Sequence, residues 1–590
     1  MSKFERSVVI TLRLALLAGF SILAVYLFHL QVMRGEYYRR IAENNYVRLV
    51  RIPPSRGEIF DRRNRPVVVN VPTLNLYLVP GMIANRTALN RFLQHHLGIA
   101  SAEIEEIIEE YRFNPMGAAL LSPNVPFEIY VRMQENLNYF PALSFRRENG
   151  RKYLLPAHFL GYIGRIGEEE YARLKDDDYQ RDDFLGKAGL EKTYETLLRG
   201  EAGYEVRQVD ARGKSLNLLR HTMQKEPKPG LELVLSIDME LQRYARELLA
   251  GYERAAAVAI DPRTGEVLCW VSQPGFDQNR FMRRMSTQEW QELVDDPSRP
   301  LLDRVQQGTY PPGSVFKPVT ASLALERGVV TPQERLANCT GGMQIGDRWF
   351  RCWQEWGHGR TNMTEALKVS CDVYFYDLSS RLELDDWNQW THDNGWVDET
   401  GIDLPTQRKG FFPNTAWYRE RYGRYTSIPG HMVNLSIGQG EVLTSPLHVC
   451  CYYAALADGG TWRTPHFFRR VIGENASAIN ESTAFSSRRL PMQQSTLEVI
   501  RHGLWRVVNE EHGTASSARV EGATVYGKTG SAENHQSEET HAWFAGWAEW
   551  SEPEIAVTVF VENAGHGGAV AAPIGGKILD FYARNIRTNP

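Results

Sequence analysis

The first pattern along the chain is a long hydrophobic run near its N-terminus. From Leu14 to Val32 almost every residue is apolar and none carries a formal charge, and about 20 such residues are what a helix needs to cross a bilayer. A cleaved signal peptide would require small residues at the end of the run, whereas Leu27 to Leu30 are bulky. The pattern therefore predicts a retained transmembrane anchor at 14–32 behind a short tail at 1–13. Lysine and arginine flank the run on both sides, so the positive-inside rule does not orient it.

Beyond a basic stalk from Arg34 to Arg56, the pattern becomes that of short strands and helices. Branched residues at partly alternating positions predict strands, and longer charged stretches with a periodic apolar face predict helices. The expected strands lie at 67–69, 74–79, 233–237, 255–260, 266–272, 523–530, 541–550 and 555–563, and the expected helices at 103–111, 186–198, 239–249 and 571–586.

The stretch from Lys225 to Gly230 contains two prolines and is the expected boundary between two domains. It separates an N-terminal domain at 33–225 from a C-terminal domain at 226–590. In the C-terminal domain, strand pairs at both ends enclose a largely helical middle. This arrangement predicts an α+β fold whose sheet takes strands from both ends of the domain.

Composition narrows the possible functions only a little. A chain of 590 residues can hold two or more domains with large cores, and its net charge of -4 gives no indication of a nucleic-acid partner. The hydrophobic fraction of 43% is that of a globular protein. Six cysteines in this length do not form a disulfide framework.

The candidate chemistry begins in the stretch from Tyr310 to Pro318. Two prolines and a glycine should deliver Ser314 to the first turn of a helix, and Lys317 then lies one turn further along the same face. A serine hydroxyl becomes a strong nucleophile when a neighbouring base takes its proton, and a buried lysine can be that base. A capping serine followed by a surface lysine would give the same four residues, so the tetrapeptide alone does not decide.

Two further motifs follow in order along the chain. Ser370 and Asp372 lie two residues apart in a loop before an expected helix. The run from Lys528 to Ser531 closes an expected strand, where Gly530 leaves room for a substrate along the strand edge. A cationic strand edge suits a peptide that ends in a carboxylate and binds partly as an added strand.

Together, the order S-x-x-K, S-x-D and K-T-G resembles the penicillin-recognising acyltransferases. The segments 56–62, 186–195, 436–441 and 541–546 are similar to class B penicillin-binding proteins. Tyr310 to Gly313, Trp356 to Gly359 and the aspartate of the second motif are most similar to the penicillin-binding protein 2 branch, whose members cross-link peptidoglycan during cell elongation. The resemblance covers nearly the whole chain. It implies a mostly β pedestal domain and a transpeptidase domain with an antiparallel sheet flanked by helices.

The resemblance also implies the roles of the site residues. Ser314 would attack the bond between the two terminal D-alanines of a stem peptide, and Lys317 would take its proton. Ser370 and Lys528 would relay a proton to the leaving amine. The substrate-binding residues would be Asp372, Thr529, Gly530 and Ser531. The backbone N–H groups of Ser314 and Ser531 would form the oxyanion hole. Asp372 replaces the asparagine of many relatives, and Ser531 replaces their threonine.

For the whole protein, the resemblance implies a single-pass protein of the inner membrane with its catalytic domain in the periplasm. The expected partners are peptidoglycan stem peptides, β-lactams, and a glycan polymerase of the SEDS family with other membrane proteins of the elongation complex. Region 33–225 would be the non-catalytic pedestal. Two alternatives stay open: a hydrolase of the D,D-carboxypeptidase or β-lactamase type, and a catalytically silent scaffold of that complex.

Three of the six cysteines and one histidine gather between the first two motifs. Cys339, Cys352, His358 and Cys371 would make a complete tetrahedral set for a structural zinc ion, and the surrounding glycines would let the segment fold back on itself. Some relatives of the penicillin-binding protein 2 branch resemble this arrangement. A Cys339–Cys352 disulfide is the chief competitor, since the periplasm is oxidising. The third alternative is that these four residues are unrelated. The other three cysteines lie in apolar segments and are expected to be buried and inert. Catalysis itself requires no cofactor.

Lys317→Arg tests the base directly. We expect it to impair acylation by a fluorescent penicillin as severely as Lys317→Ala, because a guanidinium stays protonated at any workable pH. The measurement is the rate of labelling of each variant beside the wild type. A Lys317→Arg rate within about tenfold of wild type would exclude Lys317 as the base.

Overall fold

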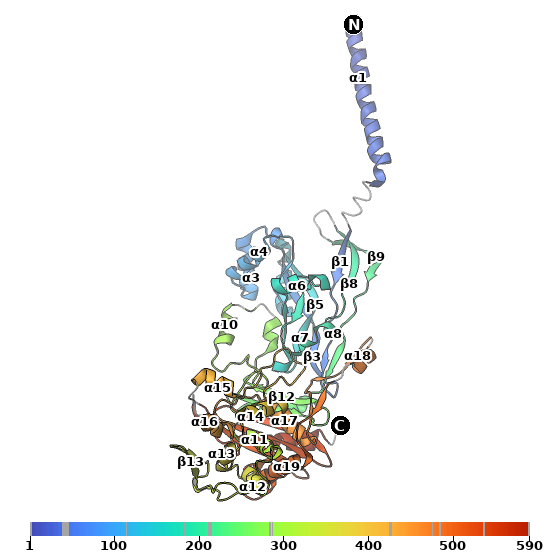
Figure 1. The fold of residues 1–590 in the computed structure, drawn as a ribbon. Helices are drawn as coiled ribbons and strands as arrows, with labels where there is room; N and C mark the ends of the chain where they lie inside the picture. The colour runs from blue at the N-terminus through green and yellow to red at the C-terminus, as the bar shows by residue number, and fades with distance from the viewer. Residues whose placement is uncertain are drawn as a thin grey trace. The chain divides into compact units, whose positions relative to one another are not determined.

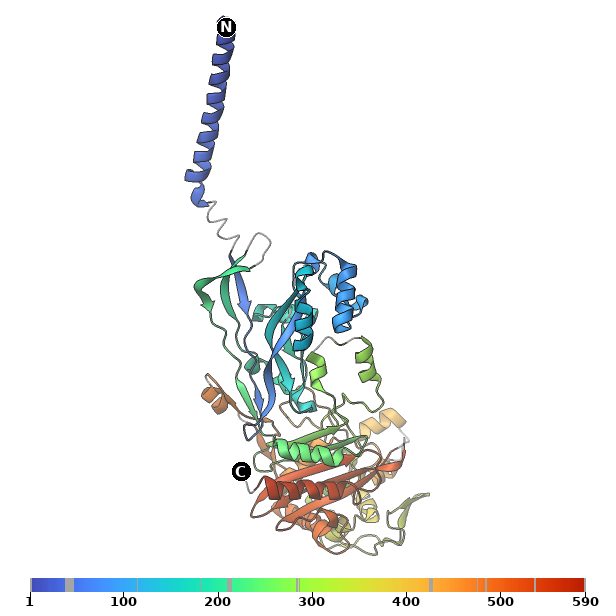
Figure 2. The same cartoon turned by 180° about the vertical axis from the view of Figure 1, so that it is seen from behind.

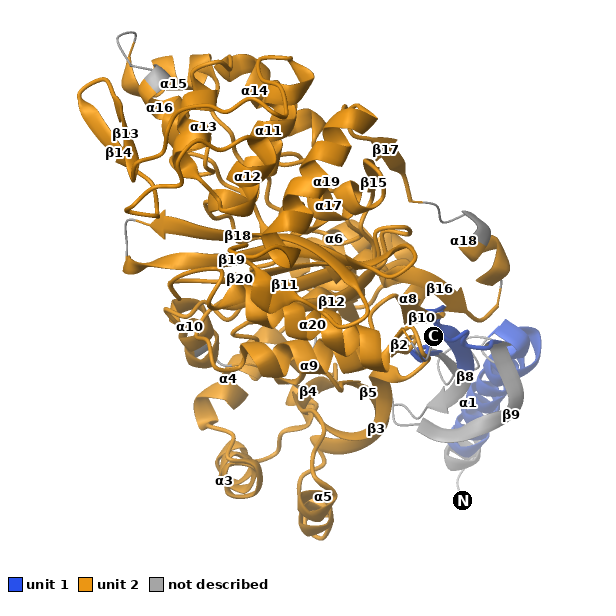
Figure 3. Ribbon diagram, turned by 90° about the horizontal axis from the view of Figure 1, so that it is seen from below, with its two compact units in different colours: residues 1–56, 199–230 blue, residues 57–198, 231–590 orange. Residues whose placement is uncertain are grey.

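The computed structural model describes residues 3–37, 47–113, 115–181, 183–209, 215–282, 285, 287–423, 428–474, 476–482, 485–534 and 537–587. Contacts between residues divide the chain into two compact units, one of residues 1–56 and 199–230 and the other of residues 57–198 and 231–590 (Figure 3). The domain boundaries expected from the sequence, 33–225 and 226–590, divide the chain differently and stay a prediction.

The first unit contains the N-terminal helix and a small sheet. Helix α1 (Lys3–Phe28) continues into a π-helical turn at His29–Met33 (Figure 1). Within the described residues, Val8–Met33 is the one helix long and apolar enough to cross a membrane, as the sequence predicted. Strands β1 (Val47–Ile52), β8 (Gly203–Val209) and β9 (Ser215–Lys225) form an antiparallel sheet in that order. Residues 38–46 of the expected stalk lie outside the described residues.

The second unit begins with a six-stranded sheet that combines distant parts of the sequence. Its order is β16-β10-β2-β3-β4, and β5 pairs with β3. The expected strands 67–69 and 74–79 are one continuous strand, because β3 runs unbroken beside β5. The strands are β2 (Ile59–Phe60), β3 (Pro66–Leu78), β4 (Ala119–Ser122), β5 (Leu143–Tyr153), β10 (Glu232–Leu235) and β16 (Phe468–Ile472).

Short helices accompany this sheet and the small strand pair β6 (Ile163–Arg165) and β7 (Phe184–Gly186). Leu89, Leu93, Ile104 and Ile107 pack with Leu76 and Leu78 of β3 in a core of their own. The helices are α3 (Arg86–Leu97), α4 (Ser101–Glu110), α5 (Phe127–Gln134), α6 (Glu168–Leu174), α7 (Gly189–Thr193) and α8 (Glu195–Leu198).

A second, five-stranded antiparallel sheet has the order β12-β11-β20-β19-β18, so it joins two early strands to three late ones. This confirms the predicted sheet with strands from both ends of the domain. The strands are β11 (Ala255–Ile260), β12 (Val267–Gln273), β18 (Thr524–Asn534), β19 (Ser537–Glu549) and β20 (Pro553–Val561). Strand β11 is buried throughout, because helices cover both faces of the sheet.

The two faces of this sheet belong to two different cores. Ala255, Ala257 and Ala259 of β11 pack with helices α9 (Met239–Leu249) and α20 (Ala571–Asn585), which lie side by side over one face (Figure 2). The alternate residues Ala256 and Val258 belong to the main core on the opposite face, with α11 (Lys317–Glu326) and α17 (Pro446–Ala457). The alternation follows the two-residue period of a strand.

The remaining elements of the second unit lie mostly on the α11 side of the sheet (Figure 3). They are α10 (Thr287–Asp295), α12 (Met363–Lys368), α13 (Asp372–Ser379), α14 (Leu384–Asp393), α15 (Thr415–Tyr422), α16 (Ile428–Leu435), α18 (Ala476–Ser482), α19 (Gln494–Asn509) and the hairpins β13 (Gly342–Ile345) with β14 (Arg348–Arg351) and β15 (Thr461–Arg463) with β17 (Ser487–Arg489).

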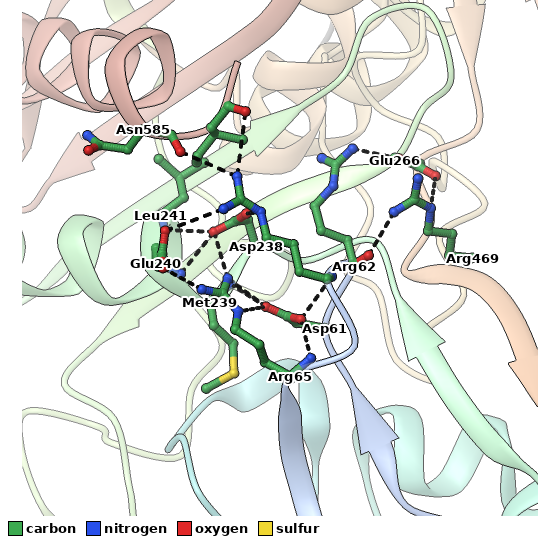
Figure 4. Close-up of polar contacts among 12 residues, drawn as sticks. Asp61, Arg62, Arg65, Asp238, Met239, Glu240, Leu241, Glu266, Arg469 and Asn585 are labelled. Atoms are coloured by element: carbon green, nitrogen blue, oxygen red, sulfur yellow. Dashed lines mark hydrogen bonds and ion pairs between the residues drawn. The ribbon is translucent and has the colours of Figure 1, made fainter. Parts of the chain in front are cut away.

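A buried carboxylate joins the two sheets of this unit (Figure 4). Asp61 lies in the turn between β2 and β3, is fully buried, and accepts the backbone N–H groups of Arg63 and Arg65 at 2.9 and 2.8 Å. It also accepts the Met239 N–H at the start of α9, at 3.3 Å. Arg65 donates to Asp61 and to Asp238, the residue whose side chain caps α9. The 56–62 segment thus fixes the six-stranded sheet against α9.

Candidate active site

Ser314 lies in a 3-10 turn, Gly313–Phe316, that leads directly into α11. The turn packs closely on β18. Gly313 has a φ of +56°, and a Cβ there would come 3.0 Å from the Ser531 carbonyl oxygen. On the approach to the turn, the Trp543 indole N–H donates to the Pro311 carbonyl at 3.0 Å. The sequence prediction of a nucleophile in the first turn of a helix agrees with this geometry.

Lys317 is fully buried, and its ammonium has three partners. It donates to the Ser370 carbonyl at 2.9 Å, to Ser370 Oγ at 3.1 Å and to Asp372 Oδ1 at 2.7 Å. The second motif therefore surrounds the lysine of the first. Ser370 sits between α12 and α13 with a φ of +53°, a conformation that serine rarely adopts, and this turn aims its hydroxyl and its carbonyl at the same amine.

Lys528 completes the group from the side of the sheet. Its side chain is fully buried, and Nζ donates to Ser370 Oγ at 2.8 Å and to the Thr529 carbonyl at 3.1 Å. One serine hydroxyl is thus within hydrogen-bond distance of two lysine amines. The structure brings together all four residues predicted to be catalytic: Ser314 on its turn, and Lys317, Ser370 and Lys528 in direct contact.

Burial and charge set the protonation of this group. Burial and the neighbouring Lys317 ammonium lower the pKa of Lys528 well below its ordinary value. Burial raises the pKa of Asp372, although the Lys317 ammonium opposes that shift. Two ammonium groups around one carboxylate would leave a net charge in a dry site, so the arrangement favours a neutral Lys528 beside a Lys317–Asp372 ion pair.

Both carboxylate oxygens of Asp372 have partners in the protein. Its Oδ1 accepts from Lys317 at 2.7 Å, and its Oδ2 accepts the backbone N–H of Trp353 at 3.1 Å. The side chain is buried. The sequence analysis assigned this residue to the donor peptide, and that role stays a prediction. The contacts in the structure are those of a residue that positions Lys317.

The K-T-G motif lies in the middle of β18 and does not close the strand as expected, since pairing with β19 continues beyond it to Ala532. The expected role of Gly530 in making room for a substrate stays a prediction. A Cβ there would come 2.9 Å from the Pro312 carbonyl, so glycine lets the serine turn approach the strand. Strand β18 is at the edge of its sheet, as binding of a peptide as an added strand requires. Thr529 and Ser531 lie on this strand near the Ser314 turn, with partners in Thr514 Oγ1 at 2.7 Å and the Gly567 N–H at 3.2 Å.

The predicted cysteine and histidine cluster also forms. The ligand atoms of Cys339, Cys352, His358 and Cys371 all lie within 4.8 Å of one another. His358 Nδ1 is 3.7 Å from Cys339 Sγ and 3.5 Å from Cys352 Sγ. In a tetrahedral zinc site with ordinary bond lengths, sulfur and nitrogen ligands lie about 3.6 Å apart. These residues therefore fit a zinc ion.

The competing disulfide is not formed, since all six cysteines are free and buried. Hydrogen bonding from Cys371 lowers the pKa of both Cys339 and Cys352, which favours thiolates. Burial opposes charge on His358, but hydrogen bonds to Cys352 and Cys339 raise its pKa overall. The fold-back expected from the glycines is present: a Cβ on Gly357 would come 2.0 Å from the Cys339 carbonyl.

Sequence reasoning missed the residues that hold the approach to Ser314. Tyr310 donates its hydroxyl to Glu562 Oε1 at 2.8 Å, and Arg304 Nε donates to the same oxygen at 3.0 Å. Burial, reinforced by the Glu562 carboxylate, raises the pKa of Tyr310, which therefore stays a donor. Tyr310 begins the 310–318 stretch that the sequence analysis singled out. No local sequence pattern connects it to Glu562, which lies 252 residues away.

Comparison with known proteins agrees with this geometry. Residues 255–580 match the penicillin binding protein transpeptidase domain, and residues 51–235 match the penicillin-binding protein dimerisation domain. The chain therefore belongs to the penicillin-binding protein family and carries its transpeptidase domain. The predicted family, fold class and enzyme class are confirmed.

Individual relatives place it within that family. A peptidoglycan D,D-transpeptidase MrdA of Haemophilus influenzae is 31% identical, over 98% of this chain and 91% of the relative. Penicillin-binding protein 2 of Helicobacter pylori, solved in complex with MreC, is 27% identical with a TM-score of 0.77, over 91% of this chain and 99% of that one. A chain from a peptidoglycan synthase complex that coordinates polymerization and crosslinking is 27% identical with a TM-score of 0.72, and both chains are covered completely. The resemblance to the penicillin-binding protein 2 branch is thereby confirmed.

Asp372→Asn tests the ion pair. The amide keeps the shape of the side chain but removes the charge that balances the buried Lys317 ammonium. We expect the apparent Tm and the rate of penicillin acylation to fall together, since a buried charge left without its partner costs about 3–5 kcal/mol. Asp580→Asn, which removes a surface partner of Arg584, serves as the matched control and leaves both unchanged. An apparent Tm equal to that of the wild type in Asp372→Asn would contradict the ion pair.

Proposed function

We propose that this chain is a peptidoglycan D,D-transpeptidase that cross-links stem peptides through an acyl-enzyme on Ser314 during cell elongation. The observation that carries the proposal is the Ser370 hydroxyl, held at 3.1 Å from Lys317 Nζ and 2.8 Å from Lys528 Nζ behind the serine turn. Burying two lysine amines around one hydroxyl destabilises the folded protein. A catalytically silent scaffold would have no need of this arrangement. The two amines and the hydroxyl form a route along which a proton can move.

In the acylation step, Ser314 Oγ attacks the carbonyl between the two terminal D-alanines. Lys317 is an ammonium in the resting ion pair, so it first passes one proton through the Ser370 hydroxyl to the neutral Lys528. As a neutral amine it then accepts the serine proton. Negative charge then develops on the carbonyl oxygen, and the backbone N–H groups of Ser314 and Ser531 stabilise it. The close packing of Gly313 on Ser531 supports this assignment, because it keeps the two N–H groups near each other.

When the peptide bond breaks, the leaving amine of D-alanine needs a proton. The Ser370 hydroxyl donates it and is reprotonated from Lys528, which becomes neutral again, while Lys317 keeps the proton of Ser314. An amine of a neighbouring stem peptide then attacks the ester, gives its proton back along the same route and frees Ser314. The balance is one amide formed for one broken, with D-alanine released.

The donor peptide would lie along the exposed edge of β18. A peptide added to this edge forms main-chain hydrogen bonds, and its terminal carboxylate reaches Thr529 and the Lys528 end of the motif. Ser531 lies further along the same strand, beside the serine turn. β-Lactams would acylate Ser314 in the same position, as substrate analogues.

The apolar helix at Val8–Met33 supports a single-pass anchor in the inner membrane, with the catalytic unit in the periplasm where the substrate is. A solved relative belongs to a complex that couples polymerization to crosslinking, and another binds MreC. We therefore infer a membrane-embedded glycan polymerase of the SEDS family as the main partner, together with other proteins of the elongation complex.

A structural zinc ion is the second part of the proposal. Cys339, Cys352, Cys371 and His358 Nδ1 would hold it in a closed tetrahedral site with no open position for catalysis. The Asp372 backbone N–H donates to Cys352 Sγ at 3.4 Å, so the ion would fix the loop that carries Ser370 and Asp372. When bound, it supplies folding energy and takes no part in the reaction.

The activity is tested on the full-length chain in detergent. We expect the wild type to be labelled by a fluorescent penicillin, Ser314→Ala to take up no label, and the control Ser380→Ala, on the exposed end of α13, to label like the wild type. Product analysis on cross-linkable peptidoglycan then separates transfer from hydrolysis. Absence of label on the wild type would refute an enzyme, and D-alanine release without cross-linked product would favour a carboxypeptidase.

The zinc site is tested by metal analysis together with a thiol count after denaturation. We expect about one zinc per chain and six reduced thiols in the wild type. Cys352→Ser and His358→Ala should lower metal content, apparent Tm and acylation together, whereas Cys450→Ala, whose buried thiol lies outside the cluster, keeps the metal. Zinc well below one equivalent with two oxidised thiols would refute the site in favour of the disulfide.

A further inference from the structure

Three exposed tryptophans lie in the segment 349–356, which folds back on the hairpin before the second motif: Gly341 approaches the carbonyl of Glu355, the residue before Trp356, and Gly342 lies under the Trp349 indole. Trp349, Trp353 and Trp356 are 49%, 56% and 89% exposed. Tryptophan normally gives up most of its surface on folding, as Trp387 and Trp543 do here, and clustered exposed aromatic groups mark a binding surface. The reaction chemistry described above uses none of the three indoles.

The structure holds two of these rings in place. The Trp353 indole N–H donates to the Val369 carbonyl at 3.0 Å, and its ring centroid lies 5.4 Å from that of His358. Trp349 lies across the hairpin over Gly342, where a Cβ would come 2.5 Å from the indole. The polar edge of Trp353 is thus satisfied inside the protein, and its apolar surface is left outside. Rings held in this way lose little freedom when a ligand binds.

The cluster is continuous with the catalytic group. The Trp353 backbone N–H donates to Asp372 Oδ2 at 3.1 Å, and Asp372 Oδ1 accepts from Lys317 at 2.7 Å. Asp372 therefore contacts both Trp353 and Lys317, the lysine that activates Ser314. Strands β13 and β14 pack against α13 and project from the second unit at this point (Figures 1 and 3). A substrate larger than the stem peptide reaches this surface while its peptide is at Ser314.

The proposed substrate has such a larger part. Each stem peptide is attached to a chain of N-acetylated sugars, and a sugar ring with equatorial substituents presents a flat face of C–H groups. A broad aromatic face buries that surface with good dispersion contact, while the hydroxyl groups stay in water. Arg348, Arg351 and Arg360 belong to the same stretch of the chain and are exposed, which suits the carboxylates of the attached peptides.

We propose that Trp349, Trp353 and Trp356 form a binding platform for the glycan strand whose stem peptide enters the active site. This inference rests on the proposed function and adds a polysaccharide subsite to it. The platform orients the strand, so that the stem peptide approaches Ser314 from the side of the second motif. It gives the enzyme a preference for peptides that are attached to glycan over free peptides.

The test uses the full-length chain in detergent, with peptide-free glycan strands as the binding probe. We expect the variant with Trp349→Ala, Trp353→Ala and Trp356→Ala to bind these strands at least about tenfold more weakly than wild type, since aromatic anchors dominate such contacts. Its preference for glycan-attached over free stem peptide should fall by a similar factor. Trp356→Tyr, which keeps an aromatic face, should retain most of the affinity. Trp290→Ala is the matched control, because Trp290 is 42% exposed on α10.

The outcomes separate this inference from the proposed function. If the wild type takes up no penicillin label, the proposed function itself is refuted. The glycan-binding measurement does not test that function. With labelling intact, glycan affinity within about twofold of wild type in the triple variant would overturn the platform. Equal losses on free and attached peptide would also overturn it, because a merely structural role predicts that result. Retained glycan binding with lost binding to anionic vesicles, or to a protein partner, would assign the surface to that ligand instead.

Discussion

Two buried lysines and one carboxylate set the conditions for everything else in the catalytic unit. Lys317 and Lys528 both reach the Ser370 hydroxyl, and Asp372 is the one anion in contact with Lys317 among the described residues. Charge buried without a partner costs several kcal/mol. The site is therefore stable only with one amine neutral and the other paired, which is also the state from which a proton can move. Stability and chemistry here depend on the same balance.

Three separate parts of the chain must meet to maintain that balance. The serine turn packs on β18 because Gly313 and Gly530 leave no Cβ between them. The loop with Ser370 and Asp372 is braced by the cysteine cluster through Cys352 and by the Trp353 backbone. Strand β18 itself is fixed by pairing with β19 along most of its length. Backbone groups take part in each of these contacts, so they hold the two amines and the hydroxyl within hydrogen-bond distance, which proton transfer requires.

The same unit ties its catalytic sheet to the six-stranded sheet through Asp61. That carboxylate accepts from the β2–β3 turn and from the first turn of α9, and α9 lies against the catalytic sheet (Figure 4). Strand β10 also enters the six-stranded sheet in parallel with β2. The family's dimerisation segment therefore contributes backbone to the same compact unit as the transpeptidase segment. Scaffolding is a sufficient physical role for the 56–62 segment.

The sequence by itself determined the apolar N-terminal helix, most strands of the five-stranded sheet and the four candidate catalytic groups. These features depend on local patterns: an uninterrupted apolar run, a two-residue period, and side chains at fixed spacing on one helix turn or strand. The cysteine and histidine cluster could also be predicted from the sequence, because its members lie in one short segment. The roles expected of the site residues came from the resemblance to penicillin-binding proteins. That resemblance rested on the order of the three motifs along the chain.

Tertiary structure alone decided what each group touches. Asp372 pairs with Lys317, Gly530 makes room for a backbone carbonyl, and Glu562 holds Tyr310 across 252 residues. The hydrogen bond from the Trp353 backbone N–H to Asp372 is another contact that only the tertiary structure shows. No sequence pattern encodes these contacts, because each depends on which surfaces pack together after distant strands have paired. The sequence pattern determines which helices and strands form and which reactive side chains they carry. Tertiary packing determines which residues those side chains contact.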